Sequence, residues 1–253
     1  MSESSFFNGL ILAWFALSAM IFISLFFIVA PYGRHAARGW GLRISSQAGW
    51  VIMESIAPVV FAICFILGNN RNTICGIVFL VLWEAHYIHR AYIYPLSRRD
   101  SNKSIPLAVV CLGFIFNSVN GYLNGRYIFV LSNGYPNSWL WDPRFISGMI
   151  LFIVGFVINR QSDLTLRDLR GPGETGYRIA NTGLFRWISC PNYLGEIIIW
   201  SGWALATWSL AGLSFAVWTA ANLVPRARAH HRWYRKNFPD YPVQRKSLVP
   251  GIW

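Results

Sequence analysis

Charged side chains are scarce in this chain. Asp, Glu, Lys and Arg make up 13% of its 253 residues, whereas 55% of the residues are hydrophobic and 17% are aromatic. A soluble domain carries about 25% charged residues. Residues 4–33, 104–125 and 197–225 contain no charged side chain, and about 20 such residues suffice to cross a bilayer as a helix. The composition predicts an all-α, multi-pass integral membrane protein and argues against a large soluble protein.

Several motifs of soluble enzymes are also missing. The chain has no P-loop, and no GxGxxG follows a strand, so a nucleotide would not be held by a Rossmann domain. No GxSxG is present to suggest a hydrolase. The cysteines Cys64, Cys75, Cys111 and Cys190 form no CxxC pair, which argues against a disulfide framework and a cysteine metal site.

Apolar runs predict about seven membrane-spanning helices. The chain has no repeat, low-complexity tract or linker, so residues 1–253 are interpreted as a single domain. The block 197–225 is too long for one crossing, and we divide it at residues 207–212. The predicted spans are residues 8–30, 47–68, 72–95, 105–124, 145–161, 193–208 and 211–229.

The distribution of Lys and Arg predicts the orientation in the membrane. Of the 22 basic residues, 18 fall in the loops of one side and in the tail 225–253. The other side has Arg71, Arg126 and Arg144, and Arg90 lies within the third span. The excess places the C-terminus in the cytosol and the N-terminus outside. The net charge of +12 is explained by this topology and by anionic headgroups, without nucleic acid as a partner.

Ionisable residues inside the spans are candidates for function, because they are costly in hydrocarbon. Glu54 lies in the second span, and the third carries Glu84, His86, His89 and Arg90. A purely structural role for Glu54, paired with Arg90, is the alternative. His86 and His89 share a helical face with Glu84 nearby, but no third strong ligand has suitable spacing, so no metal site is predicted.

A dense polar run, NRQSDLTLRDLRGPGETGYRIANTGLFRWISCPNYLGE, occupies residues 159–196 between apolar segments. Its mixture of Arg, Asp, Tyr and Gly-Pro-Gly suggests a surface for a large, charged, hydrogen-bonding ligand such as a nucleotide. Within it, LRGPGETGYRIANTGLFRWISCPNYLGEIIIW strongly resembles the C-terminal signature of the steroid 5α-reductases. The tail RARAHHRWYRKNFPDYPVQRKSLVPGIW, the upstream PYGRH and the segment HYIHRAYIYPL match the same family. The resemblance covers nearly the whole chain and is most specific in residues 159–253.

The resemblance implies a seven-helix membrane enzyme that takes NADPH from the cytosol. It implies reduction of the C4–C5 double bond of 3-oxo-Δ4 steroids by hydride transfer to C5. Glu54 and Tyr87 should hold the C3 carbonyl, and Trp50 should line the steroid pocket. The residues that it assigns to the cofactor are Tyr32, Asn159, Asp163, Arg170, Tyr177, Arg178, Asn192, Glu196, His230, Tyr234 and Arg245.

The chemistry of these residue types fits that assignment. Two donors at the carbonyl oxygen would stabilise the charge that hydride addition builds there, and Glu54 is expected to be protonated at neutral pH in its apolar span. The membrane-dissolved substrate is a steroid or isoprenoid enone. The membrane would be the endoplasmic reticulum in a eukaryote and the inner membrane in a bacterium. The family's YRIP-x-GG becomes YRIANTG at 177–183, which leaves the substrate open.

Three alternatives remain beside this reading. A related reductase would act on a polyprenyl or enoyl-CoA substrate. A membrane methyltransferase of the isoprenylcysteine type, using S-adenosylmethionine, shares the Asn-Tyr-x-Gly-Glu segment at 192–196 but needs no phosphate-binding cations. A lipid-binding or transport protein without catalytic activity would leave the polar run 159–196 unexplained.

Overall fold

The computed structural model describes residues 2–36, 39–97, 103–169, 171 and 176–253. Contacts divide the chain into two compact units. Unit 1 comprises residues 1–11 and 31–145, and unit 2 comprises residues 12–30 and 146–253.

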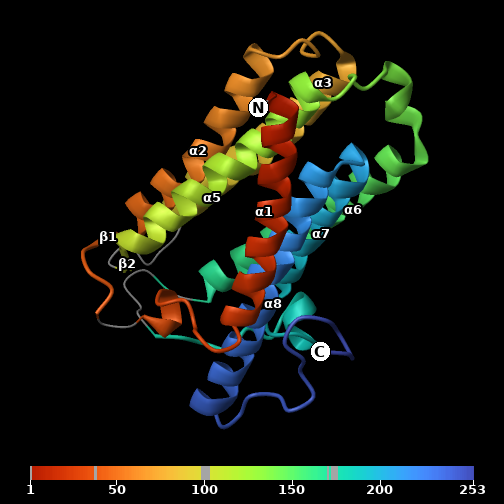
Figure 1. Cartoon of the computed structure of the whole chain (residues 1–253). Helices are drawn as coiled ribbons and strands as arrows, with labels where there is room; N and C mark the ends of the chain where they lie inside the picture. Colours follow the sequence, from red (N-terminus) through yellow and green to blue (C-terminus); the bar gives the residue numbers. More distant parts are fainter. Residues whose placement is uncertain (1, 37–38, 98–102, 170, 172–175) are drawn as a thin grey trace. The chain divides into compact units, whose positions relative to one another are not determined.

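The fold is mostly helical, as predicted, and each expected span corresponds to a helix (Figure 1). Four helical segments, Glu3–Ser24, Ser46–Ile66, Leu107–Leu131 and Pro143–Asp168, are long and apolar enough to cross a membrane. The number of seven crossings stays a prediction. The main helices are α1 (Glu3–Ser24), α2 (Ser46–Ile66), α3 (Ile74–Ile88), α5 (Leu107–Arg126), α6 (Pro143–Asp168), α7 (Pro191–Thr207) and α8 (Leu210–Asn237).

Three helix ends predicted from hydropathy were wrong by several residues, and α1 also begins at Glu3 instead of residue 8. α1 ends at Ser24 instead of residue 30, α6 continues to Asp168 instead of residue 161, and α8 continues to Asn237 instead of residue 229. Hydropathy marks the apolar part of a helix, whereas the backbone hydrogen bonds of α6 and α8 continue into polar sequence that contains no breaker. Arg235 and Lys236 lie in the last turn of α8, where their positive charges interact favourably with the negative end of the helix dipole.

The division of the block 197–225 is confirmed. α7 ends at Thr207, and Trp208 takes up a left-handed conformation with φ 42° and ψ 47°. Ser209 then caps α8, because its hydroxyl accepts a hydrogen bond of 2.9 Å from the Gly212 amide. A polar cap of this kind satisfies an amide that the first turn of a helix leaves open. Two residues therefore reverse the chain between the last two helices.

Unit 1 is built on the contact between α2 and α5, which lie side by side (Figure 1). Short strands precede the two helices, β1 (Arg43–Ser45) and β2 (Ser104–Pro106), and they pair antiparallel with Ile44 opposite Ile105. This small sheet departs from the all-α expectation, because three-residue strands leave no alternating pattern in the sequence. The buried residues Met53, Ile105 and Val110 form a core beside the sheet.

The third predicted span, 72–95, is a helix interrupted by a π turn. α3 passes at His89–Ile93 into this wider turn and continues as α4 (Tyr94–Ser97). A second π segment, Tyr127–Leu131, extends α5. A π turn inserts one residue into a helix and changes the direction of the side chains that follow, and such turns are frequent at functional sites. Arg90 lies within the first of these turns.

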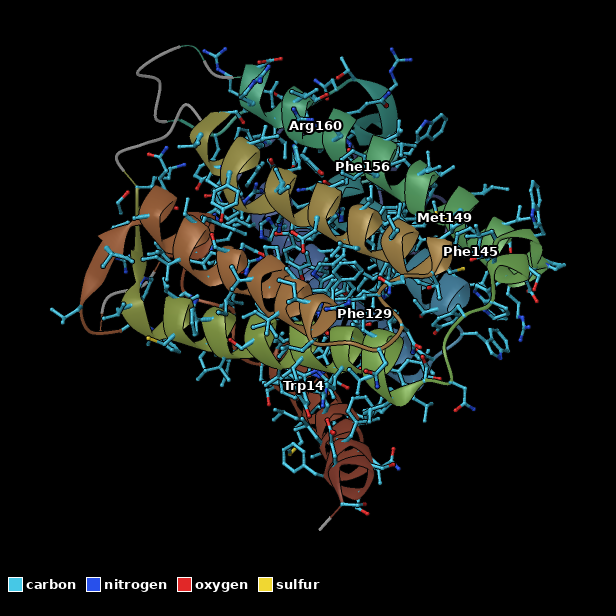
Figure 2. The ribbon with its side chains drawn as sticks, turned by 90° about the horizontal axis from the view of Figure 1, so that it is seen from above. Trp14, Phe129, Phe145, Met149, Phe156 and Arg160 are labelled. Carbon is cyan, nitrogen blue, oxygen red and sulfur yellow. The ribbon has the colours of Figure 1, made fainter. Side chains whose placement is uncertain are left out.

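In unit 2, α6, α7 and α8 run side by side (Figure 1). Figure 2 shows Met149, Phe156 and Arg160 following one another along α6. α6 and α7 are close enough that a Cβ added to Gly202 would lie 2.5 Å from the Gly148 carbonyl oxygen and 2.6 Å from the Phe152 nitrogen. Only a residue without a side chain permits such a contact.

The C-terminal segment folds back onto the loop that precedes α7. The Ser189 amide donates to the Lys246 carbonyl at 2.8 Å, and the Lys246 amide donates to the Trp187 carbonyl at 2.9 Å. Cys190, Ala227 and Leu248 form a small buried cluster beneath this contact. The tail is thereby tied to the start of α7.

Substitution of Gly202 by alanine tests the contact between α6 and α7. Its new methyl group would meet backbone atoms that cannot turn away, so Gly202→Ala is expected to lower stability by about 1–3 kcal/mol. The thermal unfolding midpoint of the detergent-solubilised protein measures this. Gly9→Ala is the matched control, because a Cβ at Gly9 in helix α1 would meet no atom within 4 Å. Equal midpoints for the two variants would contradict the prediction.

Candidate functional site

Glu54 and Tyr87 both contact the buried side-chain amide of Asn117, a residue of α5. The Tyr87 hydroxyl donates to Asn117 Oδ1 at 3.3 Å. Asn117 Nδ2 donates to the Met53 carbonyl at 2.6 Å and lies 3.5 Å from Glu54 Oε2. Three neighbouring helices, α2, α3 and α5, each contribute one of these side chains. The two residues predicted to hold a substrate carbonyl thus lie beside one another in unit 1.

Arg90 lies on the other side of Glu54. Its Nε is 3.7 Å from Glu54 Oε1, so the pairing considered as an alternative from the sequence is present. The guanidinium also lies over the Trp50 ring, 4.8 Å from its centroid. A charge-assisted N–H···O bond is typically 2.7–2.9 Å long, so these two atoms are in ionic contact at more than hydrogen-bond length.

Tyr87 is held by the aromatic side chains of its own helix. It is 2% exposed, and its ring lies 5.0 Å from that of Trp83 and 5.3 Å from that of His86. Trp83 is itself fixed to α2, because its Nε1 donates to the Ala57 carbonyl at 3.4 Å. The hydroxyl of Tyr87 is therefore carried on a rigid support.

Tyr32 and Trp50 are half-buried residues of unit 1. Both pack against the core of Met53, Ile105 and Val110. Tyr32 thus lies in the same unit as Glu54, whereas the other described residues that the resemblance assigns to the cofactor belong to unit 2.

The first cofactor group in unit 2 is a network of amides and carboxylates between α6 and α7. Asn159 Nδ2 donates to the Asn192 carbonyl at 3.0 Å and to Glu196 Oε1 at 3.2 Å. Asn192 Nδ2 donates to Asp163 Oδ1 at 3.2 Å. Trp200 Nε1 donates to Glu196 Oε2 at 3.1 Å. The four polar residues predicted from the sequence are therefore brought together.

This network depends on the close approach of the two helices. A Cβ at Gly195 would lie 2.6 Å from the Asn159 nitrogen, so the backbones touch at this level. Asparagine has a short side chain, and it reaches the first turn of α7 only across such a contact. Pro191 at the start of α7 suits the first turn of a helix, where no amide partner is needed.

A second group joins α7 to α8. The Tyr193 hydroxyl lies 3.4 Å from His230 Nε2 and accepts a hydrogen bond of 2.9 Å from Arg226 Nε. His230 and Arg226 are each 9% exposed. The predicted His230 is therefore positioned by a tyrosine and an arginine that the sequence reasoning did not select.

The third group surrounds Arg245 in the C-terminal segment. Arg245 donates to the Ala180 carbonyl at 3.0 Å and to Asn181 Oδ1 at 2.9 Å. Its guanidinium lies 4.9 Å from the centroid of the Tyr241 ring, and Tyr234 stacks on that ring at 5.1 Å. Arg245 is 4% exposed, and its Nε has no hydrogen-bond partner among the described residues.

Three further predicted cofactor residues lie in or near the polar run. Tyr177 packs against Trp233 with ring centroids 5.0 Å apart, and Arg178 is exposed. Arg170 lies outside the described residues.

Asn117 is the main residue that sequence reasoning missed. Ionisable residues stand out in apolar helices, and asparagine is not ionisable. Asn117, Asn120 and Asn124 are 5%, 0% and 1% exposed, and their spacing places them on one face of α5. Three amides on one face of an apolar helix would have been a usable signal. Among the described residues, no group of three or more His, Cys, Asp or Glu is placed to hold a metal ion.

A family model described as 3-oxo-5-alpha-steroid 4-dehydrogenase matches residues 103–253. The chain belongs to the steroid 5-alpha-reductase family. Steroid 5-alpha-reductase DET2 of Gossypium hirsutum is 38% identical to it over 258 residues, which cover 100% of this chain and 99% of the relative. 3-oxo-5-alpha-steroid 4-dehydrogenase 1 of Bos taurus is 40% identical over 242 residues, 94% of this chain and 93% of the relative.

Membership confirms the resemblance found in the sequence motifs. The human 3-oxo-5-alpha-steroid 4-dehydrogenase 1 is 39% identical over 223 residues, 87% of this chain and 85% of the relative. A member of the steroid 5-alpha-reductase family is an oxidoreductase that acts on a CH–CH bond with a nicotinamide cofactor.

The tail of this family member contains a titratable cluster around Ser189. Its hydroxyl donates to the Lys246 carbonyl at 3.1 Å and lies 2.7 Å from both His231 Nδ1 and the Tyr241 hydroxyl. Burial lowers the pKa of His231 below its ordinary value of 6.5, and the positive charges of Arg235, Arg245 and Lys246 lower it further.

This shift predicts a loss of stability in acid. The unfolded chain takes up a proton at His231 at a higher pH than the folded chain does, so stability falls as the pH drops below the ordinary histidine pKa. We expect the unfolding midpoint to decrease as the pH is lowered from about 7 to about 5. His231→Gln removes this titration and should flatten the slope. A slope that is the same in both proteins would show that other groups dominate.

Proposed function

We propose that the protein reduces the C4–C5 double bond of a 3-oxo-Δ4 steroid with NADPH. The observation that carries this proposal is the meeting of Glu54 and Tyr87 on Asn117, in a chain of the steroid 5-alpha-reductase family. Two relatives are named steroid 5-alpha-reductase and 3-oxo-5-alpha-steroid 4-dehydrogenase, and these names support a 3-oxo steroid as the substrate.

The proposed role of Glu54 and Tyr87 is to donate hydrogen bonds to the C3 carbonyl oxygen. Hydride addition at C5 moves electrons through the conjugated system and builds negative charge on that oxygen. Donors already in place stabilise the charge where it develops. The Tyr87 hydroxyl is a donor as it stands, whereas Glu54 donates only when it carries a proton.

The residues of unit 2 fit a phosphate-bearing dinucleotide. The buried Arg245 has an Nε without a hydrogen-bond partner among the described residues, and Arg178 is exposed. Guanidinium groups bind phosphate oxygens through parallel N–H bonds. Asn159, Asn192 and Glu196 offer amide and carboxylate groups for the polar edges of such a ligand. When bound, the reduced nicotinamide supplies the hydride.

We also propose the orientation indicated by the basic residues, with the C-terminus and the polar run 159–196 in the cytosol. This places the nucleotide residues where NADPH is dissolved, while the substrate enters from the bilayer. The membrane is that of the endoplasmic reticulum in a eukaryote or the inner membrane in a bacterium.

The direct test of the function is a substrate comparison. NADPH consumption by the purified protein is measured with testosterone, progesterone and a polyprenal, and the products are identified. We expect the two steroids to give 5α-reduced products. Reduction of the polyprenal alone would assign the related polyprenyl activity instead.

The catalytic pair is tested by substitution. Glu54→Ala and Tyr87→Phe each remove one donor, and each is expected to lower turnover about 10²-fold or more. Glu54→Gln keeps a donor and should retain part of the activity. NADPH binding is the control and should survive all three changes. Parental turnover in folded, NADPH-binding Glu54→Ala and Tyr87→Phe proteins would assign the pair a structural role.

The preference for the phosphorylated cofactor is tested at Arg178. NADPH is expected to bind more tightly than NADH, because a guanidinium group recognises the additional phosphate. Arg178→Ala should weaken NADPH binding about 10-fold or more and leave NADH binding nearly unchanged. Arg186→Ala removes the same charge from another exposed position in unit 2 and serves as the control. Equal affinity of the parental protein for both cofactors, measured by titration, would refute the assignment.

The orientation is tested in sealed vesicles. A tag after residue 253 should be accessible from the cytosolic side, because most basic residues flank that side. Protection of the tag from cytosolic protease, with cleavage after detergent is added, would reverse the proposed topology.

A further inference from the structure

The orientation of the Asn117 amide follows from a single contact. Its nitrogen lies 2.6 Å from the Met53 carbonyl oxygen, and a carbonyl oxygen can only accept a hydrogen bond. The reversed amide would place two oxygens against each other. Oδ1 therefore faces the Tyr87 hydroxyl, and that hydroxyl must be the donor in the bond of 3.3 Å.

The packing of α5 on α2 brings this amide within reach. Gly113 and Gly121 lie one turn before and one turn after Asn117. A Cβ at Gly113 would be 2.8 Å from Met53 Sδ, and one at Gly121 would be 2.9 Å from the Ala57 carbonyl oxygen. The two glycines let the helices approach on both sides of Asn117, so its short side chain reaches the backbone of α2.

The bonds from Asn117 to Tyr87 and Glu54 are long. The O–H···O bond from Tyr87 measures 3.3 Å and the N–H···O bond to Glu54 measures 3.5 Å, whereas such bonds are usually 2.7–2.8 Å and 2.9–3.0 Å long. A long bond orients a donor at small energetic cost and is readily exchanged for a shorter one. An oxygen that gains negative charge during the reaction is a stronger acceptor than a neutral amide. Interactions that strengthen only in the transition state raise the rate.

We propose that Asn117 is a positioning residue, which directs the Tyr87 hydroxyl and the Glu54 carboxyl toward one substrate oxygen. This inference rests on the proposed function of that pair. Before the substrate arrives, the Tyr87 hydroxyl donates its hydrogen bond to Asn117 Oδ1. As the substrate carbonyl oxygen becomes charged, the hydroxyl donates to that oxygen instead. Its own anchor, the bond to the Met53 carbonyl, does not change during the reaction.

The test begins with Asn117→Leu, which keeps the approximate volume and removes both hydrogen-bonding atoms. We expect the turnover of progesterone to fall about 10- to 100-fold, with unchanged NADPH affinity. Ser118→Ala is the matched control, because the neighbouring Ser118 hydroxyl donates to the Phe114 carbonyl of its own helix at 2.8 Å. Ser118→Ala should keep the parental turnover.

A double-variant cycle separates positioning from a general packing effect. In the Tyr87→Phe background the hydroxyl is already gone, so the further loss caused by Asn117→Leu should be smaller than in the parental protein. A full, multiplicative loss in both backgrounds would overturn the proposal. If Tyr87→Phe itself retains parental turnover, the proposed function of the pair fails first, so the two failures are distinguishable.

Asn117→Asp provides a readout that packing alone would not move. Aspartate keeps an acceptor for Tyr87 but replaces the donor that faces Met53 and Glu54. Protonation of the new carboxyl group restores one O–H donor. The turnover of Asn117→Asp relative to the parental protein should therefore rise as the pH is lowered from about 8 to about 6. A ratio that does not change with pH would show that this donor is not needed.

Discussion

Close contact between helix backbones is the constraint on which both groups of functional residues depend. Polar side chains in apolar helices need partners, and the shorter ones reach a neighbouring helix only where the backbones touch. Gly121 makes this possible between α2 and α5, and Gly195 makes it possible between α6 and α7. Asn117 and Asn159 each lie beside one of these contacts. The glycines thus determine which polar residues can meet.

The two units use hydrogen bonds differently. In unit 2, Asn159, Asn192 and Glu196 are linked by bonds of 3.0–3.2 Å, which hold the side chains in one arrangement. In unit 1, Tyr87 and Glu54 are joined through Asn117 by contacts of 3.3 Å and 3.5 Å. A rigid network suits the recognition of an unchanging ligand. Looser contacts suit groups that must exchange partners while charge develops on a substrate.

The helices could be predicted from the sequence because a long uncharged run in a membrane must satisfy its backbone hydrogen bonds internally, which a helix does. The reversal at Trp208 could be placed because one helix would have been too long for a membrane. The β1–β2 pair and the π turn at His89–Ile93 depend on contacts between distant segments or on local hydrogen bonding. Neither produces a pattern in the residues themselves, so neither was predicted.

Some residues of the candidate site could likewise be predicted from the sequence, and others could not. Glu54 and Asp163 stand out because ionisable groups are rare here, and the family motifs identify Tyr87 and His230. Asn117, Tyr193 and Arg226 gain their importance from what they touch. Asn117 is neither charged nor part of a quoted motif, and Tyr193 and Arg226 lie within motifs that give them no role, so their partners on other helices are what identifies all three. The motifs identify the candidate site residues, and the structure identifies the neighbours that hold them in place.

The short joint at Trp208 has a consequence for the order in which the chain assembles. Two residues separate α7 from α8, so bringing these helices together closes a very small loop and costs little chain entropy. The bonds between Ser189 and Lys246 close a loop that contains both helices, and closing this longer loop costs more chain entropy unless the hairpin has formed. We therefore expect α7 and α8 to pair as one hairpin first and the tail to dock last.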